Sequence, residues 1–242
     1  MAMPSATKWP KTFPPLTPEQ ERIRDEFMHA WHEELPKKYG IIERFNHGYV
    51  VKHAPATFTT TLEIGAGIGE HLEYERLTPK QRENYVAVEL RAPMADEIRK
   101  RCPDVQVRVG DCQQRLDFAD GHFDRILAVH VLEHLPDLPA AIREMHRLCN
   151  PERGRFQVVI PTEGGLAYSL ARRISAQRFF EKRWPSMPYK LVIEREHMNV
   201  PAEILELLDE RFVIEHRSFF PLAVPSVNMN LAIGLTLEPR PA

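Results

Sequence analysis

Short apolar runs alternate with helical patterns through the middle of the chain. Five runs have the length and apolar content of buried strands, and they lie near 58–64, 84–89, 104–109, 123–129 and 154–160. Stretches with helical spacing of apolar residues lie between them, near 69–77, 92–101 and 137–149. Strands that alternate with helices over short links predict right-handed βαβ units and a parallel sheet. Two last strands are expected over 213–219 and 229–237.

The region before the first strand predicts a tail and two helices. Residues 1–16 hold four prolines and little to bury, so we expect a mobile tail. Thr17, Pro18 and Gln20 are typical of a helix start, because Thr17 can cap the helix and Gln20 can close a capping box. We expect this helix to end before Pro36, and a second short helix to follow near 41–51.

The link after the first predicted strand is rich in glycine. Residues 62–70 read Leu-Glu-Ile-Gly-Ala-Gly-Ile-Gly-Glu. Glycines let the backbone bend sharply and let a ligand approach the main chain closely. A dinucleotide fingerprint would place its third glycine at position 70, where this chain has Glu70, with Gly69 one residue earlier. Because an acidic side chain at a helix start repels a pyrophosphate, we expect a nucleoside without phosphates, and the alternative is a turn without any ligand.

The second predicted strand ends in Glu89, about twenty residues after the glycines, where a carboxylate can accept both ribose hydroxyls. With two further motifs, this order resembles the class I S-adenosylmethionine-dependent methyltransferases. The motifs are Glu63-x-Gly65-x-Gly67-x-Gly69, Glu89, Gly110-Asp111-Cys112, and Phe123-Asp124 followed by Val131-Leu132-Glu133-His134-Leu135.

The resemblance implies a site for S-adenosylmethionine. The glycine turn would hold the methionine part, Glu89 would hold the ribose, and Asp111 and the Cys112 amide would bracket the adenine. The cofactor-binding residues expected on this basis are Glu63, Gly65, Ala66, Gly67, Glu89, Leu90, Asp111, Cys112, Val129 and His130.

Pattern and resemblance together predict an α/β fold. We expect a Rossmann-like, doubly wound, mostly parallel seven-stranded sheet with a terminal antiparallel strand, N-terminal helices and a helical insertion before the sixth strand. Residues 17–242 should form a single methyltransferase domain, with a helical cover over 17–53 and an acceptor-side insertion over 162–200. The resemblance places the cover over cofactor and acceptor, with His47 and Tyr49 as candidates there, and the alternative is a helical pair at the sheet edge.

His130 is the residue that we expect to act as general base or to orient the acceptor. It follows the fourth strand, and ligands of open parallel sheets bind at the carboxyl ends of the strands. An ordinary histidine pKa of about 6.5 suits proton abstraction near neutral pH. The alternative is that His130 lines the pocket through its backbone alone. His134 and His197 are further catalytic candidates.

The run His130-x-x-Glu133-His134 also resembles a metal-binding run. Metal-dependent ubiquinone-biosynthetic O-methyltransferases and small-RNA 2′-O-methyltransferases carry Glu-x-x-Glu-His at this place. Histidine instead of the first glutamate lowers the negative charge offered to Mg²⁺ and favours a softer ion such as Zn²⁺. We expect no bound metal, and this run is the alternative site.

The predicted insertion mixes basic and aromatic side chains. The cations are Arg172, Arg173, Arg178, Lys182, Arg183, Lys190 and Arg195, and the aromatic residues are Tyr168, Phe179, Phe180, Trp184 and Tyr189. This mixture can bind an anionic acceptor, such as a nucleotide sugar, a carboxylate or a phosphate-bearing lipid. The alternative, which is the commoner one for such a mixture, is a solvated helix face with an apolar core stripe.

Composition limits the classes of partner. The 242 residues include 32 Lys and Arg against 34 Asp and Glu, a formal net charge of -2, which disfavours a nucleic acid. The 3 cysteines form no Cys-x-x-Cys pair and fit a reducing compartment. Apolar runs are shorter than the roughly 20 residues of a membrane span, and the N-terminus lacks the apolar core of a signal peptide, so we expect a cytoplasmic protein.

The sequence therefore predicts an enzyme that moves a methyl group from S-adenosylmethionine to oxygen or nitrogen of a small molecule, of anionic or sugar type. We expect it to act as a monomer or homodimer. An RNA methyltransferase is one alternative, disfavoured by the charge and by the lack of an Asn-Pro-Pro-Tyr-like motif. A non-catalytic, cofactor-binding partner subunit is the other alternative.

Overall fold

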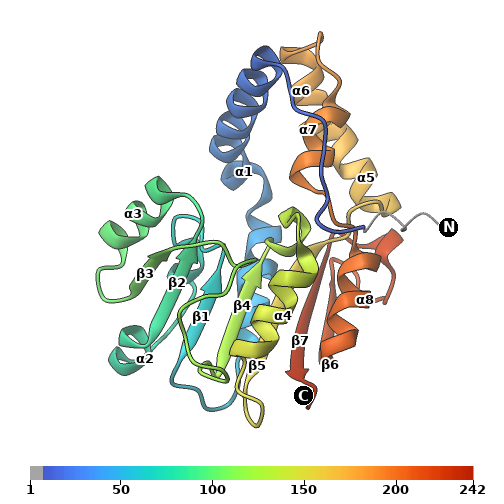
Figure 1. Ribbon diagram of the computed structural model, residues 1–242. Helices are drawn as coiled ribbons and strands as arrows, with labels where there is room; N and C mark the ends of the chain where they lie inside the picture. The colour runs from blue at the N-terminus through green and yellow to red at the C-terminus, as the bar shows by residue number, and fades with distance from the viewer. Residues whose placement is uncertain (1–7, 242) are drawn as a thin grey trace, which may run out of the picture.

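The computed structural model describes residues 8–241, apart from the side chains of residues 31–39. Within that range a single sheet of seven strands forms the middle of the molecule (Figure 1). The strands are β1 Thr61–Ile64, β2 Tyr85–Glu89, β3 Gln106–Val109, β4 Arg125–Val129, β5 Arg155–Pro161, β6 Phe212–Phe220 and β7 Ala232–Pro239. Their order is β3-β2-β1-β4-β5-β7-β6, and β7 alone runs antiparallel to its neighbours. The expected Rossmann-like, mostly parallel sheet with an antiparallel last strand is confirmed.

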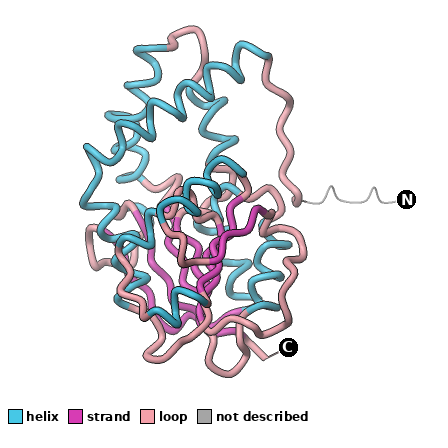
Figure 2. Tube along the Cα trace, turned by 90° about the vertical axis from the view of Figure 1, so that its left-hand side faces the viewer, coloured by secondary structure: helices cyan, strands magenta, loops and turns pink. Residues whose placement is uncertain are grey.

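Helices cover both faces of the sheet (Figure 2). The α-helices are α1 Pro18–Lys52, α2 Pro79–Glu83, α3 Ala92–Arg101, α4 Leu138–Leu148, α5 Leu166–Arg172, α6 Arg178–Arg183, α7 Tyr189–Glu196 and α8 Pro201–Arg211. Three short 3₁₀ turns, η1 Glu70–Glu73, η2 Leu132–His134 and η4 Val227–Met229, and one π-helical turn, η3 Arg173–Gln177, complete the described elements.

The two faces of the sheet are packed by different helices. Ile126 and Ala128 belong to an apolar cluster with residues of α4 and α8, whereas Leu127 belongs to a cluster with residues of α1 and α3. Successive residues of a strand point to opposite faces, so a strand buried on both faces needs apolar residues at nearly every position. This explains why the central strands β1, β2, β4 and β5 could be recognised as continuous apolar runs.

A third apolar cluster, separate from the two on the faces of the sheet, lies above the carboxyl ends of the parallel strands. The first part of α1 and the helices of 166–196 enclose it, and we call residues 18–30 and 166–196 the cap (Figure 1). Phe27 is 3% exposed, and its ring meets those of Phe180 and Tyr189 edge-on, at centroid distances of 5.2 and 5.9 Å. The cap is therefore held by its own aromatic core.

Helix α1 corrects the expectation of two N-terminal helices separated at Pro36. It is one helix, Pro18–Lys52, and its first part belongs to the cap while Tyr49 and Val50 pack on the sheet. A proline inside a helix removes one hydrogen bond and bends the axis, and Figure 1 shows the helix changing direction between cap and sheet. Packing at both ends outweighs this local cost, so the helix continues through Pro36.

The helix expected over 69–77 is also wrong in extent. Only the short turn η1, Glu70–Glu73, is helical there, and an additional helix, α2, begins after Thr78. Thr78 caps α2 and Gln81 closes a capping box, the same signal that starts α1. The start of α2 was therefore readable from its Thr-Pro-x-Gln pattern.

Part of the expected mobile tail packs on the body. The Lys11 amide donates to the Pro136 carbonyl at 2.9 Å, and its ammonium group contacts Glu203 at 2.6 Å and the Met198 carbonyl at 2.7 Å. Residues 8–16 are thus attached, which corrects the expectation for that stretch, and residues 1–7 lie outside the described part.

The edges of the sheet are β3 and β6. The pairing of β6 with β7 shifts by one residue between Ile214 and His216, which marks a bulge. Glu215 and Arg217 are exposed on this edge strand. Within residues 8–241, no helix is long and apolar enough to cross a membrane.

Candidate functional site

The glycine turn after β1 is built on left-handed backbone. Gly65, Gly67 and Gly69 have φ of 61°, 61° and 84°. A Cβ atom on Gly65 would lie 2.6 Å from the side chain of Val131, which follows β4. Gly65 is thus required both by its φ and by the close approach of the β4 end.

Carboxylate groups of the protein accept hydrogen bonds from two amides of this turn. The Gly67 amide donates to Glu89 Oε2 at 3.1 Å, and the Ile68 amide donates to Glu70 Oε2 at 3.1 Å. These amides are therefore engaged by anions of the protein and do not form an open nest for a phosphate. The turn suits a ligand that is positively charged and has no phosphate.

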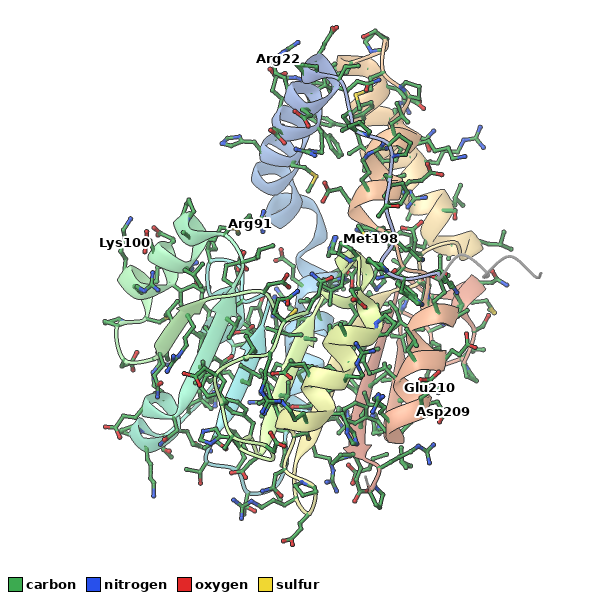
Figure 3. The ribbon with its side chains drawn as sticks, in the orientation of Figure 1. Arg22, Arg91, Lys100, Met198, Asp209 and Glu210 are labelled. Atoms are coloured by element: carbon green, nitrogen blue, oxygen red, sulfur yellow. The ribbon has the colours of Figure 1, made fainter. Side chains whose placement is uncertain are left out.

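Glu89 ends β2 and faces the turn. Its side chain is 4% exposed, and Oε1 accepts from the Arg91 amide at 3.0 Å and from Arg91 Nε at 3.2 Å. Leu90 beside it is 63% exposed. A buried carboxylate next to an exposed apolar side chain offers hydrogen-bond acceptors for ribose hydroxyls and an apolar contact for a base. Figure 3 shows Arg91 and Met198 near the edge of the sheet that faces the cap, and Arg22 at the far end of the cap.

Asp111 and Cys112 follow β3. Asp111 Oδ1 accepts from the amide and the side chain of Gln113, both at 2.9 Å. Burial raises the pKa of the Cys112 thiol to about 12, so the thiol is neutral. A neutral buried thiol leaves the backbone amide as the polar group that Cys112 can offer to a ligand.

Glu63 lies inside β1 and beneath the turn. Its carboxyl accepts from the Tyr85 hydroxyl at 2.7 Å, and burial raises its pKa. Glu63 is therefore tied to β2 through Tyr85.

His130 stands directly after β4 in an unusual backbone conformation. Its φ is 54°, the only positive φ of a non-glycine residue within residues 8–241. The His130 amide donates to the Val159 carbonyl at 2.9 Å, and ring atom Nδ1 lies 3.0 Å from Glu133 Oε1. Ring atom Nε2 is buried without a hydrogen-bond partner in the described part of the chain. Strained residues of this kind cluster at functional sites.

Glu133 is buried and ionised. Burial opposes the charge, but the bond to His130 and the charges of His134, His130 and His197 outweigh it and lower the pKa of Glu133 to about 2. A carboxylate only accepts hydrogen bonds, so Nδ1 of His130 donates to Glu133 and Nε2 is the ring nitrogen left for a ligand.

His134 and His197 complete the cluster around Glu133. Their rings meet edge-on at 5.0 Å, and His134 Nδ1 contacts the Glu196 carbonyl. Burial lowers the pKa of His134, while the charge of Glu133 opposes this shift. His197 Nδ1 lies 2.9 Å from Glu163 Oε2, and Glu163 also pairs with Arg172.

Comparison with known proteins agrees with this geometry. Residues 62–156 match the family model described as "Methyltransferase domain". Residues 62–156 of the chain therefore form a methyltransferase domain. None of the curated proteins compared with this methyltransferase matches it.

Solved structures share the fold of this methyltransferase at low identity. A TehB-like SAM-dependent methyltransferase from Corynebacterium glutamicum is 17% identical at a TM-score of 0.59, over 91% of this chain and 100% of that one. The N-methyltransferase NodS from Bradyrhizobium japonicum is 16% identical at a TM-score of 0.54, over 83% of this chain and 97% of that one. A Haloferax volcanii methyltransferase was solved with the Trm112 methyltransferase activator. It is 13% identical at a TM-score of 0.59, over 89% of this chain and 96% of that one. At these identities the likeness shows the fold alone.

The three catalytic candidates of the methyltransferase come together at the carboxyl ends of β4 and β5. The sequence did not single out Glu163 and Asn199 as part of this group. The Asn199 side chain donates to the carbonyls of Leu132 and Leu135 at 2.7 and 2.8 Å and so ties the loop after β4 to the segment before α8. Glu163 and Asn199 carry no sequence signal for this group, because the contacts of Glu163 with His197 and of Asn199 with the loop after β4 each span more than thirty residues of the chain.

The run that was the alternative metal site is engaged in internal contacts. Nδ1 of His130 faces Glu133, and Nδ1 of His134 faces a carbonyl. No group of three or more metal-ligating side chains is found among the described residues.

The insertion separates its aromatic residues from its cations. Phe180, Trp184 and Tyr189 are buried in the cap core. Arg172 is paired with Glu163, and Arg195 bonds to the carbonyls of Leu191 and Pro14. The remaining cations, Arg173, Arg178, Lys182, Arg183 and Lys190, are exposed on the cap.

Tyr49 belongs to the sheet packing. Its hydroxyl lies 3.2 Å from Thr236 Oγ1 and 3.0 Å from His216 Nδ1, and burial raises its pKa to about 12. Its ring presses on Gly234, where a Cβ atom would lie 2.5 Å away. These contacts give Tyr49 a structural role.

Proposed function

We propose that this methyltransferase moves a methyl group to an oxygen or nitrogen atom of a small molecule, with His130 as general base. One observation carries the proposal. His130 follows β4 next to the glycine turn, with Nδ1 held by an ionised Glu133 and Nε2 buried without a partner in the described chain. A positioned lone pair of this kind is what proton removal from a hydroxyl or amine requires.

The turn and the strand ends supply the residues that would hold the cofactor. When bound, S-adenosylmethionine supplies an electrophilic methyl group on a sulfonium cation. The cofactor has no phosphate, and it fits a turn whose amides are already taken by Glu70 and Glu89. Gly67, Glu89 and Leu90 would hold the methionine and ribose side, and Asp111 and the Cys112 amide would hold the adenine.

His130 and the residues around it would remove the proton, line the acceptor and exclude water. Nε2 takes the proton of the acceptor, and the Nδ1–H bond to Glu133 stabilises the imidazolium that forms. His134 and His197 lie on the cap side of the same cluster and would line the acceptor. The cap above the strand ends would exclude water from the reacting atoms.

The acceptor that fits best is neutral and bears a hydroxyl or amine, as a sugar-type molecule does. Arg172 is paired with Glu163, and the exposed cations lie on the cap surface. Glu63, Glu89 and Glu133 lie near the strand ends. This balance of charge supports a neutral acceptor over the carboxylate or phosphate that the basic insertion had suggested.

His130→Asn tests the proposal. Asparagine tolerates positive φ and can donate to Glu133, so this variant keeps the backbone and the buried bond while removing the base. We expect methyl transfer to fall by about 10²–10⁴ and the affinity for S-adenosylhomocysteine to stay within a few-fold. His122→Asn, at the exposed opposite end of β4, is the control and should be neutral. A His130→Asn enzyme that keeps more than half its turnover would remove His130 from the mechanism.

A partner-dependent enzyme is a second candidate. The Haloferax volcanii neighbour was solved with an activator protein. If this chain also needs a partner, calorimetry should show S-adenosylhomocysteine binding, while turnover on a panel of acceptors should begin only after a second chain is added.

We further propose that the enzyme works in the cytoplasm as a monomer or homodimer, without nucleic acid or a resident metal. The support is a near-neutral charge and three free cysteines among the described residues. Chelator-treated enzyme that loses its activity and regains it with Zn²⁺ would contradict the metal-free proposal.

A further inference from the structure

The first helix of the 166–196 segment carries a row of exposed apolar side chains. Leu166, Leu170 and Ile174 recur every fourth residue, so they lie on one side of α5 and of the turn η3 that continues it. Their exposed fractions are 73%, 61% and 67%, so this row is covered neither by the sheet nor by the cap core. Figure 1 shows α5 on the side of the cap away from α1. We call these three residues the apolar row.

Other residues of the same helical run make its internal contacts. Ala176 and Phe180 are buried in the cap core. Arg172 pairs with Glu163, which belongs to the cluster of titratable groups at the ends of β4 and β5. The apolar row therefore lies on a side of the helix that neither the cap core nor that cluster uses, and the methyl transfer described above does not involve it.

A second exposed apolar segment, the loop 221–229, lies against the start of α5. A Cβ atom on Gly165 would lie 2.3 Å from the Val227 carbonyl oxygen, and the Leu166 amide donates to Asn228 Oδ1 at 3.4 Å. The loop contains no charged residue. Its exposed large apolar residues are Leu222, Val224 and Met229. Half of the exposed large apolar side chains of the described residues thus gather on two neighbouring segments, and such a concentration is typical of an interaction surface.

Arginines stand beside the apolar row. Arg173 follows Leu170 by three residues and Arg178 follows Ile174 by four, so each arginine is a neighbour of the row on the helix surface. Both are exposed, and no acidic side chain of the described residues pairs with either of them. Residues 166–183 contain five Lys and Arg and a single acid, although the formal net charge of the whole chain is -2. The surface is therefore apolar with a basic border.

We propose that the apolar row and the loop 221–229 dock reversibly on an anionic membrane surface. The row enters the boundary between headgroups and acyl chains, and Arg173 and Arg178 bind lipid phosphates. An amphipathic helix with an apolar side and basic flanks binds a bilayer in this way, and guanidinium matches the geometry of phosphate. Docking of this kind needs no membrane-spanning helix. It adds a location to the enzyme and does not depend on which acceptor is methylated.

The same features disfavour two other occupants. A two-fold contact between copies of the chain through the apolar row would bring the arginines of both copies together, and like charges repel at an interface. The cores of protein interfaces are enriched in aromatic anchors, whereas the exposed apolar residues of this surface are all Leu, Ile, Val or Met. Basic charge and aliphatic side chains together fit anionic lipid best.

Sedimentation of the full chain with lipid vesicles tests the docking. We expect binding to phosphatidylcholine vesicles that contain about one third phosphatidylglycerol, and binding at least about 10-fold weaker to phosphatidylcholine alone. Leu170→Gln combined with Ile174→Gln should weaken binding by about 10-fold or more, because two apolar side chains no longer leave water. Arg173→Gln combined with Arg178→Gln should weaken it by about 10- to 30-fold, since each arginine near an anionic surface contributes about 5-fold.

Matched controls remove the same groups elsewhere. Ile41→Gln changes an apolar side chain on α1 that is 72% exposed. Arg76→Gln combined with Lys80→Gln removes two exposed cations beside and within α2. Both controls should keep the vesicle affinity within about 2-fold, because these residues lie outside the proposed surface. Every variant should keep the melting temperature and the affinity for S-adenosylhomocysteine of the unmodified chain, since all the changed side chains are exposed.

A fluorescence measurement distinguishes insertion into lipid from adsorption by charge alone. The emission of Leu170→Trp should shift to shorter wavelength when anionic vesicles are added, because the indole leaves water, and the emission of Ile41→Trp should not shift. The inference is overturned if the unmodified chain does not sediment with anionic vesicles, if the double variant of the apolar row binds them normally, or if Leu170→Trp binds without a shift. A dimer seen by light scattering that Leu170→Gln with Ile174→Gln dissociates would assign the surface to a second copy of the chain and would overturn it as well.

Discussion

Glu133 is a buried carboxylate, and the histidines around it determine whether it is ionised. Its side chain is 1% exposed, and one of its oxygens has no hydrogen-bond partner within the described chain. An isolated buried carboxylate would take up a proton, but His130, His134 and His197 keep this one ionised. The ionised form in turn sets the tautomer of His130, so the electrostatics of one residue decide the chemistry of another.

The first prediction concerns the stability that Glu133 contributes. Its pKa is about 2 in the folded chain against an ordinary value of 4.5. A lowered folded pKa means that the contribution is complete above pH 4.5 and is lost as the pH falls from 4.5 toward 2, by about 3 kcal/mol in all. Urea unfolding should therefore show Glu133→Gln less stable than the unmodified chain at pH 7, with a difference that narrows below pH 4.5.

Exposed Glu206 on α8 is the control for that series. The free energy of unfolding of Glu206→Gln should differ from that of the unmodified chain by the same amount at every pH. If the free energies of unfolding of Glu133→Gln and the unmodified chain differ by a constant amount down to pH 3, Glu133 titrates normally.

The second prediction concerns Glu89. Replacing it with glutamine removes the charge from hydrogen bonds to the ribose, each worth roughly 1.5–3 kcal/mol. We expect the dissociation constant of S-adenosylhomocysteine, measured by calorimetry, to rise by about one to two decades. Glu97 on α3, whose side chain is 42% exposed, provides the matched control, Glu97→Gln. A lower melting temperature with unchanged affinity would show that Glu89 serves the Gly67 amide alone.

At the scale of elements, the cap is the part whose stability can be separated from the sheet. Its core residues form a cluster of their own, and α1 connects that cluster to the sheet core. Regions with separate cores open in separate cooperative steps. The residues that would meet the acceptor from above therefore belong to a unit that can open while the cofactor side stays folded.

The third prediction uses Phe27 to test this separation. Phe27→Ala removes the ring at the centre of the cap core, a change that costs about 3–5 kcal/mol in a packed core. Hydrogen exchange should speed up in α5, α6 and α7 and stay slow in β1, β4 and β5. Phe13→Ala, at a 37% exposed ring, should change neither group. Uniform loss of protection over the whole chain would show one cooperative unit.

Local patterns predicted most elements, and distant contacts decided where they failed. The central strands were readable because burial on both faces requires continuous apolar runs, and α3 was readable from the helical spacing of its apolar residues. The passage of α1 through Pro36 was not readable, since the packing that sustains it lies in the cap and on the sheet. In the site, the glycine turn and the His130–Glu133 pair are local and could be predicted as motifs. The contacts of His197 with Glu163 and of His47 with His71 join distant segments, so the sequence pattern does not reveal them.

At the scale of the whole molecule, the distribution of charge selects the ligand more sharply than the net charge does. The formal net charge is -2, yet carboxylates concentrate on the glycine turn. A cationic nucleoside is favoured there and a pyrophosphate is repelled, although the fold itself is shared with dinucleotide-binding proteins.

The fourth prediction tests that selection. Calorimetry should show NAD binding at least 100-fold weaker than S-adenosylhomocysteine, a gap of about 2.7 kcal/mol. Glu70→Gln should narrow the gap, because it removes the charge at the Ile68 amide. Glu73→Gln, one turn further and exposed, should leave it unchanged. Equal affinity for both ligands in the unmodified chain would contradict the assignment of the turn.

The bulge in β6 bears on how this protein behaves when it is concentrated. An open sheet ends in a row of unpaired backbone groups, and a second molecule can add its own strand there and begin an aggregate. The register shift next to Glu215, together with the charge of Arg217, makes the nine-residue strand β6 a poor template for such growth. Replacing both charged residues with valine should therefore leave the fold intact and produce concentration-dependent light scattering, whereas the same change at Asp209 and Glu210 on α8 should not. The bulge and the charged residues of β6 therefore protect the chain against polymerisation, a role separate from methyl transfer.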